Sequence, residues 1–150
     1  MQEVSVIIPN FNGMAYLDGV LAGLECQTVN NFEVILVDNG SSDGSCAFVS
    51  ARYPWVHLIE LPENFGFCKA VNEGIKASRA PYVLLLNNDI EVTENFIEEM
   101  ISAIRRHPKA FSCAARMIQF HDRDKLDDAG NYYCALGWAY ARGKGKDIHT

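Results

Sequence analysis

The sequence predicts an α/β fold with a mostly parallel sheet and helices on both of its faces. Apolar runs of strand length alternate with segments of helical spacing, which is the usual order in such folds. A length of 150 residues with 49% hydrophobic and 21% charged side chains suits one soluble globular domain. The net charge of −6 argues against a nucleic-acid-binding surface spread over the whole chain.

Five segments are expected to be strands: Val4–Ile8, Glu33–Val37, Val56–Leu61, Tyr82–Leu86 and Ala110–Ala115. The first, second and fourth are almost continuously apolar. Such runs are typical of parallel strands that are covered on both faces. They therefore predict a buried sheet.

Four helices are expected between these strands. Apolar side chains recur at the spacing of one helix face in three of the segments: Leu17, Val20, Leu21 and Leu24; Phe67, Ala70, Val71, Gly74 and Ile75; Phe96, Ile97, Met100, Ile101 and Ile104. The segment Ser45–Tyr53 is a weaker candidate, and Pro54 ends it because proline cannot continue a helix.

The composition changes near Ile118. We expect an α/β domain over residues 1–117 and an irregular region over 118–150 that ends in a loose tail from Arg142. Residues 1–100 carry 4 basic and 14 acidic side chains, whereas residues 101–150 carry 9 basic and 5 acidic. This asymmetry indicates either a solvated surface or a basic face near an anionic ligand or a membrane.

The cysteines are too far apart in the sequence for a Cys-x-x-Cys metal or redox pair; they are Cys26, Cys46, Cys68, Cys113 and Cys134. We expect a reduced, cytoplasmic protein in which they serve as small core residues. No apolar stretch approaches the length of a membrane span, so any membrane contact is expected to be peripheral, at the inner face.

Polar loops follow the first four expected strands: Pro9–Gly13, Asp38–Gly44, Pro62–Gly66 and Asn87–Asp89. Ligands of open parallel sheets bind beyond the carboxyl ends of the strands. The four loops therefore predict one ligand site at that edge of the sheet.

Asp38 has two interpretations. Its carboxylate can close a turn at Asn39-Gly40 by accepting from loop amides and from Ser41 and Ser42, or it can accept the imide N–H of a pyrimidine base. Asp43 is expected to be the N-cap of the following helix rather than a ligand.

Asp89 and Lys69 are also open to two interpretations. Asp89 is either a Mg²⁺ or Mn²⁺ ligand that is completed by phosphate oxygens, or the cap of the turn before Thr93-Glu94. Lys69 lies in the first turn of the third helix, where it either binds phosphate or is simply solvated. The solvated alternative is favoured for Lys69.

Several classes of site are disfavoured. No glycine motif for a dinucleotide and no P-loop is present. Nucleophilic catalysis has little support, because the sequence has no serine elbow and no cysteine in the loops after the expected strands, and we interpret the four histidines as ordinary residues. A phosphoreceiver domain needs an acidic pair after the first strand, where this chain has Asn10 and Asn12.

The runs VSVIIPNFNG, EVILVDNGSSDGS, NFGFCKAVNEGI and LLLNNDI resemble, in that order, the motifs of the inverting glycosyltransferases of family two, which have the GT-A fold. The resemblance covers roughly residues 3–117. The later Asp127-Asp128-Ala129-Gly130 and Arg142-Gly143 resemble a weaker pattern of the rhamnosyltransferase-like branch. Residues 1–117 would then be the nucleotide-sugar-binding domain, and 118–150 the start of the acceptor side.

The resemblance implies a nucleotide-sugar donor, with UDP or dTDP as the nucleotide, and direct displacement with inversion. Asp38 would accept from the base, and Asp89 would hold Mn²⁺ or Mg²⁺ on the diphosphate. The other implied substrate-binding residues are Pro9, Asn10, Asn12, Asn39, Ser41, Asn64, Gly66, Lys69, Asn72, Asn87 and Asn88. The acceptor would be a saccharide, free or lipid-linked, or a protein.

Three departures from the family pattern matter. Asn87 replaces the first carboxylate of the Asp-x-Asp motif, and Val71 replaces an arginine before Asn72. The family's general base belongs to an acceptor-binding half that we expect to be missing from these residues, because nothing in 118–150 matches it. We therefore expect donor binding with little or no transfer. The alternative is a non-catalytic nucleotide- or sugar-binding module, and a sheet edge near Cys113 leaves room for a homodimer.

Overall fold

The computed structural model describes residues 2–149. The chain forms two compact units, residues 1–97 and 98–150. A division at 117/118 is predicted from the sequence, whereas the boundary between the two units along the chain falls within helix α4 (Phe96–Arg106).

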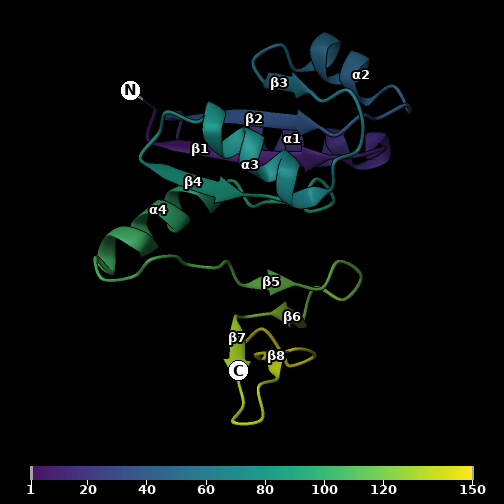
Figure 1. Ribbon diagram of the computed structural model, residues 1–150. Helices are drawn as coiled ribbons and strands as arrows, with labels where there is room; N and C mark the ends of the chain where they lie inside the picture. The colour runs from purple at the N-terminus through teal and green to yellow at the C-terminus, as the bar shows by residue number, and fades with distance from the viewer. Residues whose placement is uncertain (1, 150) are drawn as a thin grey trace. The chain divides into compact units, whose positions relative to one another are not determined.

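The first unit contains a four-stranded parallel sheet (Figure 1). Its strands are β1 (Val4–Asn10), β2 (Phe32–Asp38), β3 (His57–Glu60) and β4 (Tyr82–Leu85), in the spatial order β3-β2-β1-β4. The first four predicted strands are confirmed to within a few residues at their ends. Since all pairings are parallel, all four carboxyl ends lie at one edge of the sheet.

The predicted helices are also confirmed. They are α1 (Met14–Glu25), α2 (Ser45–Arg52), α3 (Phe67–Ala77) and α4, each in the expected segment. In Figure 1, α3 lies in front of the sheet and α1 lies behind it, so that helices cover both faces. This arrangement explains why β1 and β2 are apolar on both faces.

Alternation along the strands divides the core into two layers. Ile7, Ile35 and Val37 pack with Ala70 of α3 in one fully buried cluster. The intervening side chains, which include Val6, Ile8, Val34 and Leu36, are equally buried and point to the other face. The sheet is therefore held by apolar burial on both sides.

The second unit contains two short antiparallel pairs. Strand β5 (Met117–Ile118) pairs with β6 (Leu126–Asp128), and β7 (Asn131–Tyr133) pairs with β8 (Ala139–Ala141). The segment from Arg142 is tied to β6 by backbone hydrogen bonds, including Leu126 N–H to the Lys146 carbonyl (2.8 Å). These strands and bonds were not predicted, because neither segment has a periodic apolar pattern.

Three expectations are wrong. Residues Ala110–Ala115 form no strand: they find no partner, and Phe111 is fully exposed. The edge strands of the sheet are therefore β3 and β4, and neither is a strand near Cys113. The cysteines are not core residues, since all five are free and exposed or half-buried.

Among the described residues, no helix combines the length and the hydropathy that crossing a membrane requires.

Candidate functional site

The centre of the candidate site is the pair formed by Asn10 and Asp38. They end β1 and β2 and lie opposite each other in the parallel register. The Nδ2 of Asn10 donates to Oδ1 of Asp38 at 2.8 Å, and both residues are only 2% exposed. A buried carboxylate needs such donors to offset its loss of water.

Asn10 connects this pair to the loop after β4. Its Nδ2 also donates to Oγ of Ser41 (3.3 Å), and its Oδ1 accepts from Nδ2 of Asn88 (2.7 Å). Gly13 makes room for the last bond, because a Cβ there would overlap Asn88 Nδ2 and Asn10 Oδ1. One amide therefore joins the ends of β1, β2 and β4.

Asp38 closes a turn, as the first of its two interpretations predicts. Its Oδ2 accepts from the backbone N–H of Ser41 at 2.8 Å, while Oδ1 accepts from Asn10. A carboxylate has about four acceptor positions, so these two bonds do not exhaust it. The turn and the binding of a ligand N–H are therefore compatible.

Asn12 and the loop after β2 bind each other reciprocally. The backbone N–H of Asn12 donates to Oγ of Ser41 (2.8 Å), and the N–H of Ser42 donates to Oδ1 of Asn12 (2.9 Å). Asn12 has a φ of 49°, a left-handed conformation that asparagine tolerates better than most residues. The loops after β1 and β2 are thus locked together.

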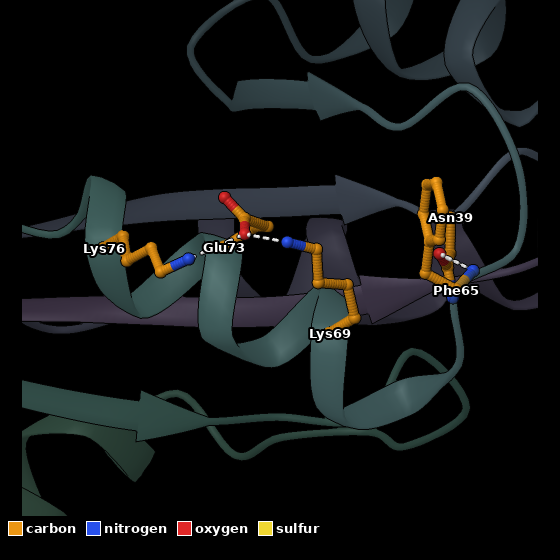
Figure 2. Close-up of polar contacts among 5 residues, drawn as sticks. All are labelled: Asn39, Phe65, Lys69, Glu73 and Lys76. Carbon is orange, nitrogen blue, oxygen red and sulfur yellow. Dashed lines mark hydrogen bonds and ion pairs between the residues drawn. The ribbon is translucent and has the colours of Figure 1, made fainter.

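A second amide pair joins the loops after β2 and β3. Asn39 donates from Nδ2 to Oδ1 of Asn64 (2.9 Å). Its own Oδ1 accepts from the N–H of Phe65 at 3.0 Å (Figure 2). Gly40 permits this approach: it has a φ of 77°, and a Cβ there would lie 2.6 Å from Cα of Glu63. Asn64 also accepts from the N–H of Gly66, the N-cap residue of α3.

Asp43 joins the first residues of two helices. Its Oδ2 accepts from the N–H of Met14 (2.8 Å) at the start of α1, and its Oδ1 accepts from the N–H and hydroxyl of Ser45 at the start of α2. The N-cap residue itself is Gly44, one position later than predicted. The Ser45 hydroxyl, helped by these amides, lowers the pKa of Asp43.

The Cys46 thiol lies close enough to Asp38 for the carboxylate to affect its pKa. Burial raises the pKa of the Cys46 thiol to about 12, and the hydrogen bond with Asp38 adds to this effect. The thiol therefore stays protonated at neutral pH and is a poor nucleophile.

Lys69 forms an ion pair on the surface of α3 (Figure 2). Its Nζ lies 2.7 Å from Oε1 of Glu73, and Nζ of Lys76 lies 2.9 Å from the same oxygen. The hydrogen bond from Lys69, with that from Lys76, lowers the pKa of Glu73 to about 2. The sequence analysis did not foresee this partner for Lys69.

The remaining predicted residues lie around this network. Asn72, Asn87 and Asp89 are exposed, Pro9 is half-buried on β1, and Gly66 begins α3 with a φ of 86°. Within residues 2–149, no three His, Cys, Asp or Glu side chains group as metal ligands.

The turn at Asn39-Gly40 is expected from the sequence, but the close approach of other loops to Gly13 and Gly40 is not, and neither is the double role of Asp43. Nothing in the sequence indicates that Asp43 reaches the start of α1, because that contact spans 29 positions.

Comparison with known proteins agrees with this geometry. The chain is 30% identical to glycosyltransferase GlyG of Streptococcus pneumoniae over 133 residues, which are 87% of this chain and 42% of GlyG. The structure of S. aureus TarS 1–349 in complex with UDP-GlcNAc aligns with a TM-score of 0.65 and 26% identity over 71% of this chain and 32% of TarS.

Mannosyltransferase PcManGT from Pyrobaculum calidifontis, solved with GDP-Man and Mn²⁺, shares the fold at a TM-score of 0.64 and 22% identity, over 68% of this chain and 32% of that one. The chain spans half or less of the length of the curated relatives it matches first. The family model described as glycosyl transferase family 2 matches residues 5–148, and this chain therefore belongs to that family, with its GT-A fold.

Proposed function

We propose that this chain is the donor-binding part of an inverting glycosyltransferase that uses a UDP- or dTDP-sugar. The observation that carries the proposal is the buried Asn10–Asp38 pair at the carboxyl ends of β1 and β2. It holds a carboxylate in fixed orientation at the edge where parallel sheets bind ligands. The comparison with TarS, solved with UDP-GlcNAc, supports the choice of a uridine nucleotide.

In this proposal the base lies against Asp38. The carboxylate would accept the imide N–H of uracil or thymine with the acceptor capacity that Asn10 and Ser41 leave free. Pro9, Asn12, Asn39 and Asn64 would line the base and ribose. Adenine has no such N–H, and guanine presents its N1–H on a larger bicyclic base, so uracil and thymine nucleotides should bind better.

The diphosphate would lie near the loop after β4. Asp89, with Asn87 beside it, would hold Mn²⁺ or Mg²⁺, and the ion would offset the charge of the leaving diphosphate. Residues 1–97 carry 12 acidic and only 4 basic side chains, so a diphosphate needs such a cation. Lys69 and Asn72 would approach the diphosphate from α3 only if Lys69 exchanged Glu73 for phosphate.

The acceptor would be a saccharide, free or lipid-linked, such as a growing cell-envelope polysaccharide. We assign no catalytic base among these residues, and we propose that residues 1–150 bind the donor with little or no transfer. A non-catalytic binding module is the less favoured alternative, because the named relatives are glycosyltransferases. We also propose that the chain belongs to the rhamnosyltransferase-like branch of the family.

Thermal shifts with UDP, dTDP, GDP and ADP, each with and without Mn²⁺ or Mg²⁺, test the proposal. At 100 times its dissociation constant a ligand stabilises by about 2.7 kcal/mol, which for this size raises Tm by roughly 5–10 °C. We expect this shift only with the pyrimidine nucleotides, and a larger one with metal.

The Asp38→Asn variant should lose the nucleotide shift, whereas Asp127→Asn, in the second unit, should keep it. Circular dichroism checks that both variants are folded. A folded wild-type protein that responds equally to all four nucleotides, or to none, contradicts the proposal.

A further inference from the structure

The second unit contains an open cavity of about 560 Å³ that the proposed donor site does not use. This volume falls within the range of small-molecule sites in proteins. Its lining comes from the residue before β5, from β6 and the turn after it, from β7 and β8, and from the segment after β8: Arg116, Leu126, Ala129, Tyr132, Tyr140, Ala141, Arg142, Gly143, Lys144 and Lys146. All of these residues belong to the same unit.

The lining is strongly basic. It includes Arg116, Arg142, Lys144 and Lys146, and no acidic residue. Lys144 is partly neutralised by Asp127 at 3.3 Å, and Arg116 donates to the backbone carbonyl of Ile148 at 3.2 Å. Within residues 2–149, no carboxylate forms an ion pair with Arg142 or Lys146. The cavity therefore carries uncompensated positive charge.

Backbone hydrogen bonds hold the cations in place. In the run Arg142-Gly-Lys-Gly-Lys146, the two glycines have φ values of 76° and 77°, which bend the chain between successive cations. Gly145 N–H donates to the Leu126 carbonyl (2.8 Å), and Lys146 N–H donates to the Gly143 carbonyl (2.9 Å). Because these bonds use only the backbone, they leave the side chains of Arg142 and Lys146 available to a ligand, while Lys144 is paired with Asp127.

Arg142 also connects two short motifs of the sequence. The Ala129 N–H donates to the Arg142 carbonyl (3.0 Å), and the Arg142 N–H donates to the Gly130 carbonyl (2.6 Å). The guanidinium of an arginine fixed in this way is suited to bidentate recognition of phosphate oxygens.

Two tyrosines form an aromatic wall beside the cations. Tyr132 and Tyr140 are register partners in the β7–β8 pair, and their ring centroids lie 5.4 Å apart. Both are about half exposed, at 48% and 56%, so their rings and hydroxyls face solvent-accessible space. Such rings offer apolar area together with a polar group, which suits a partly polar ligand attached to the phosphate.

We propose that this cavity binds the phosphate or diphosphate group of the sugar acceptor, with the tyrosines beside the group that bears it. The assignment to the acceptor rests on the proposed function; the anion site itself rests on the cavity and its charges. A phosphorylated soluble saccharide and a lipid-linked diphosphate present the same chemistry to these cations.

Nuclear magnetic resonance of the ¹⁵N-labelled chain tests the site residue by residue. Inorganic diphosphate, added without divalent metal, should shift the amide signals of Gly143 and Gly145 in a saturable way. UDP with Mg²⁺, which is diamagnetic, should shift Gly40 and Ser41, whose signals inorganic diphosphate should leave unmoved. Failure at one set of signals therefore leaves the other proposal intact.

Charge variants supply the control. The double variant R142Q/K146Q should bind diphosphate at least about tenfold more weakly, since hydrogen bonds to a charged group are the strong ones. R79Q/K109Q removes the same charge elsewhere and should bind normally. If R142Q/K146Q misfolds, R142K/K146R is a second test. It keeps both positive charges, so its affinity for diphosphate should stay within a few fold of the wild-type value.

Vesicle sedimentation distinguishes the two sources. Phosphatidylcholine vesicles with a polyprenyl diphosphate are compared with vesicles that contain phosphatidylglycerol instead. If the protein sediments only with the polyprenyl diphosphate vesicles, the acceptor is lipid-linked. If it binds soluble diphosphate but sediments with neither kind of vesicle, the acceptor is soluble. Both outcomes support the site. Equal retention on both vesicles, unmoved Gly143 and Gly145 signals, or equal binding by R142Q/K146Q and R79Q/K109Q overturns it.

Discussion

At the residue scale, Asn10 has a role that a carboxylate could not fill. Its amide donates to Asp38 and Ser41 and accepts from Asn88, so one side chain serves both donors and acceptors. An aspartate at this position would be acceptor-only and would lie against Asp38, where like charges repel. The choice of asparagine therefore gives Asp38 a hydrogen-bond donor that fixes the orientation of its carboxylate.

The Asn10→Ala variant should be destabilised by about 1–3 kcal/mol, because Asp38 and Asn88 lose a buried partner. Urea denaturation followed by fluorescence measures this difference. Asn30→Ala, at an exposed loop position, is the matched control and should leave the free energy of unfolding nearly unchanged. If the two variants unfold at the same urea concentration, the Asn10 bonds contribute nothing.

Tyr53 is a second buried polar residue with a hydrogen-bond partner, and its hydroxyl is a titratable group. Its side chain is fully buried, and its hydroxyl donates to Oδ1 of Asp18 at 2.6 Å. Burial, reinforced by this bond to Asp18, raises the pKa of Tyr53 to about 12 from 10.0. The folded state therefore holds this proton more tightly than the unfolded chain does.

A raised pKa implies stability that is present below pH 10 and lost as the pH rises to about 12. The loss amounts to roughly 3 kcal/mol at most, because a tenfold change in proton affinity is worth about 1.4 kcal/mol. Tyr53→Phe removes this contribution. We expect the difference in unfolding free energy between wild type and variant to shrink over that interval; a constant difference from pH 8 to 12 contradicts the assignment.

At the element scale, one glycine sets how closely α3 packs on the sheet. A Cβ at Gly74 would overlap Cγ2 of Ile7 and would lie 3.1 Å from Cγ2 of Val37. Both side chains belong to the fully buried cluster, and the close packing of protein interiors limits how far they can move. The approach of α3 to β1 and β2 thus depends on the absence of a side chain at this position.

Gly74→Ala should destabilise the protein by about 1–3 kcal/mol, the usual cost of overpacking a core. The matched control is Gly19→Ala in α1, where a new Cβ meets no atom within 4 Å. That variant should be more stable by about 0.5–1 kcal/mol, because alanine favours a helix more than glycine does. Urea denaturation of both proteins checks the opposite signs; equal signs would show that Ile7 yields to the new methyl group.

The edge strand β4 also matters at this scale. Tyr82, Val83 and Leu85 are 36%, 41% and 53% exposed, and β4 has a strand on one side only. An exposed apolar edge is a template for pairing with another strand. The predicted homodimer, if it forms through a sheet edge, would therefore use β4.

At the scale of the whole molecule, charge separates the two units. Residues 1–97 carry 12 acidic and 4 basic side chains, and residues 98–150 carry 7 acidic and 9 basic. An acidic unit attracts a diphosphate poorly without a cation, whereas a basic unit attracts an anion directly. This division is consistent with a metal-assisted donor site in the first unit and an anion site in the second.

The first unit could be predicted closely because its pattern is local. Strands such as Val4–Asn10 and helices such as Phe67–Ala77 are indicated by apolar periodicity within a short stretch of chain. Beyond α4 the second unit lacks that signal: its short strands depend on backbone bonds to distant residues, such as Leu126 to Lys146. Periodicity likewise suggested a strand at Ala110–Ala115 but could not supply its partner.

The sequence by itself determined the four strands, the helices between them and the polar loops that converge at one sheet edge. Only the tertiary structure decided which polar side chains meet there. The bond from Asn10 to Asp38 spans 28 positions and that to Asn88 spans 78, and each depends on strand register. Register and close approach arise from packing of the whole sheet, as at Gly13 and Gly74, and no local pattern encodes them.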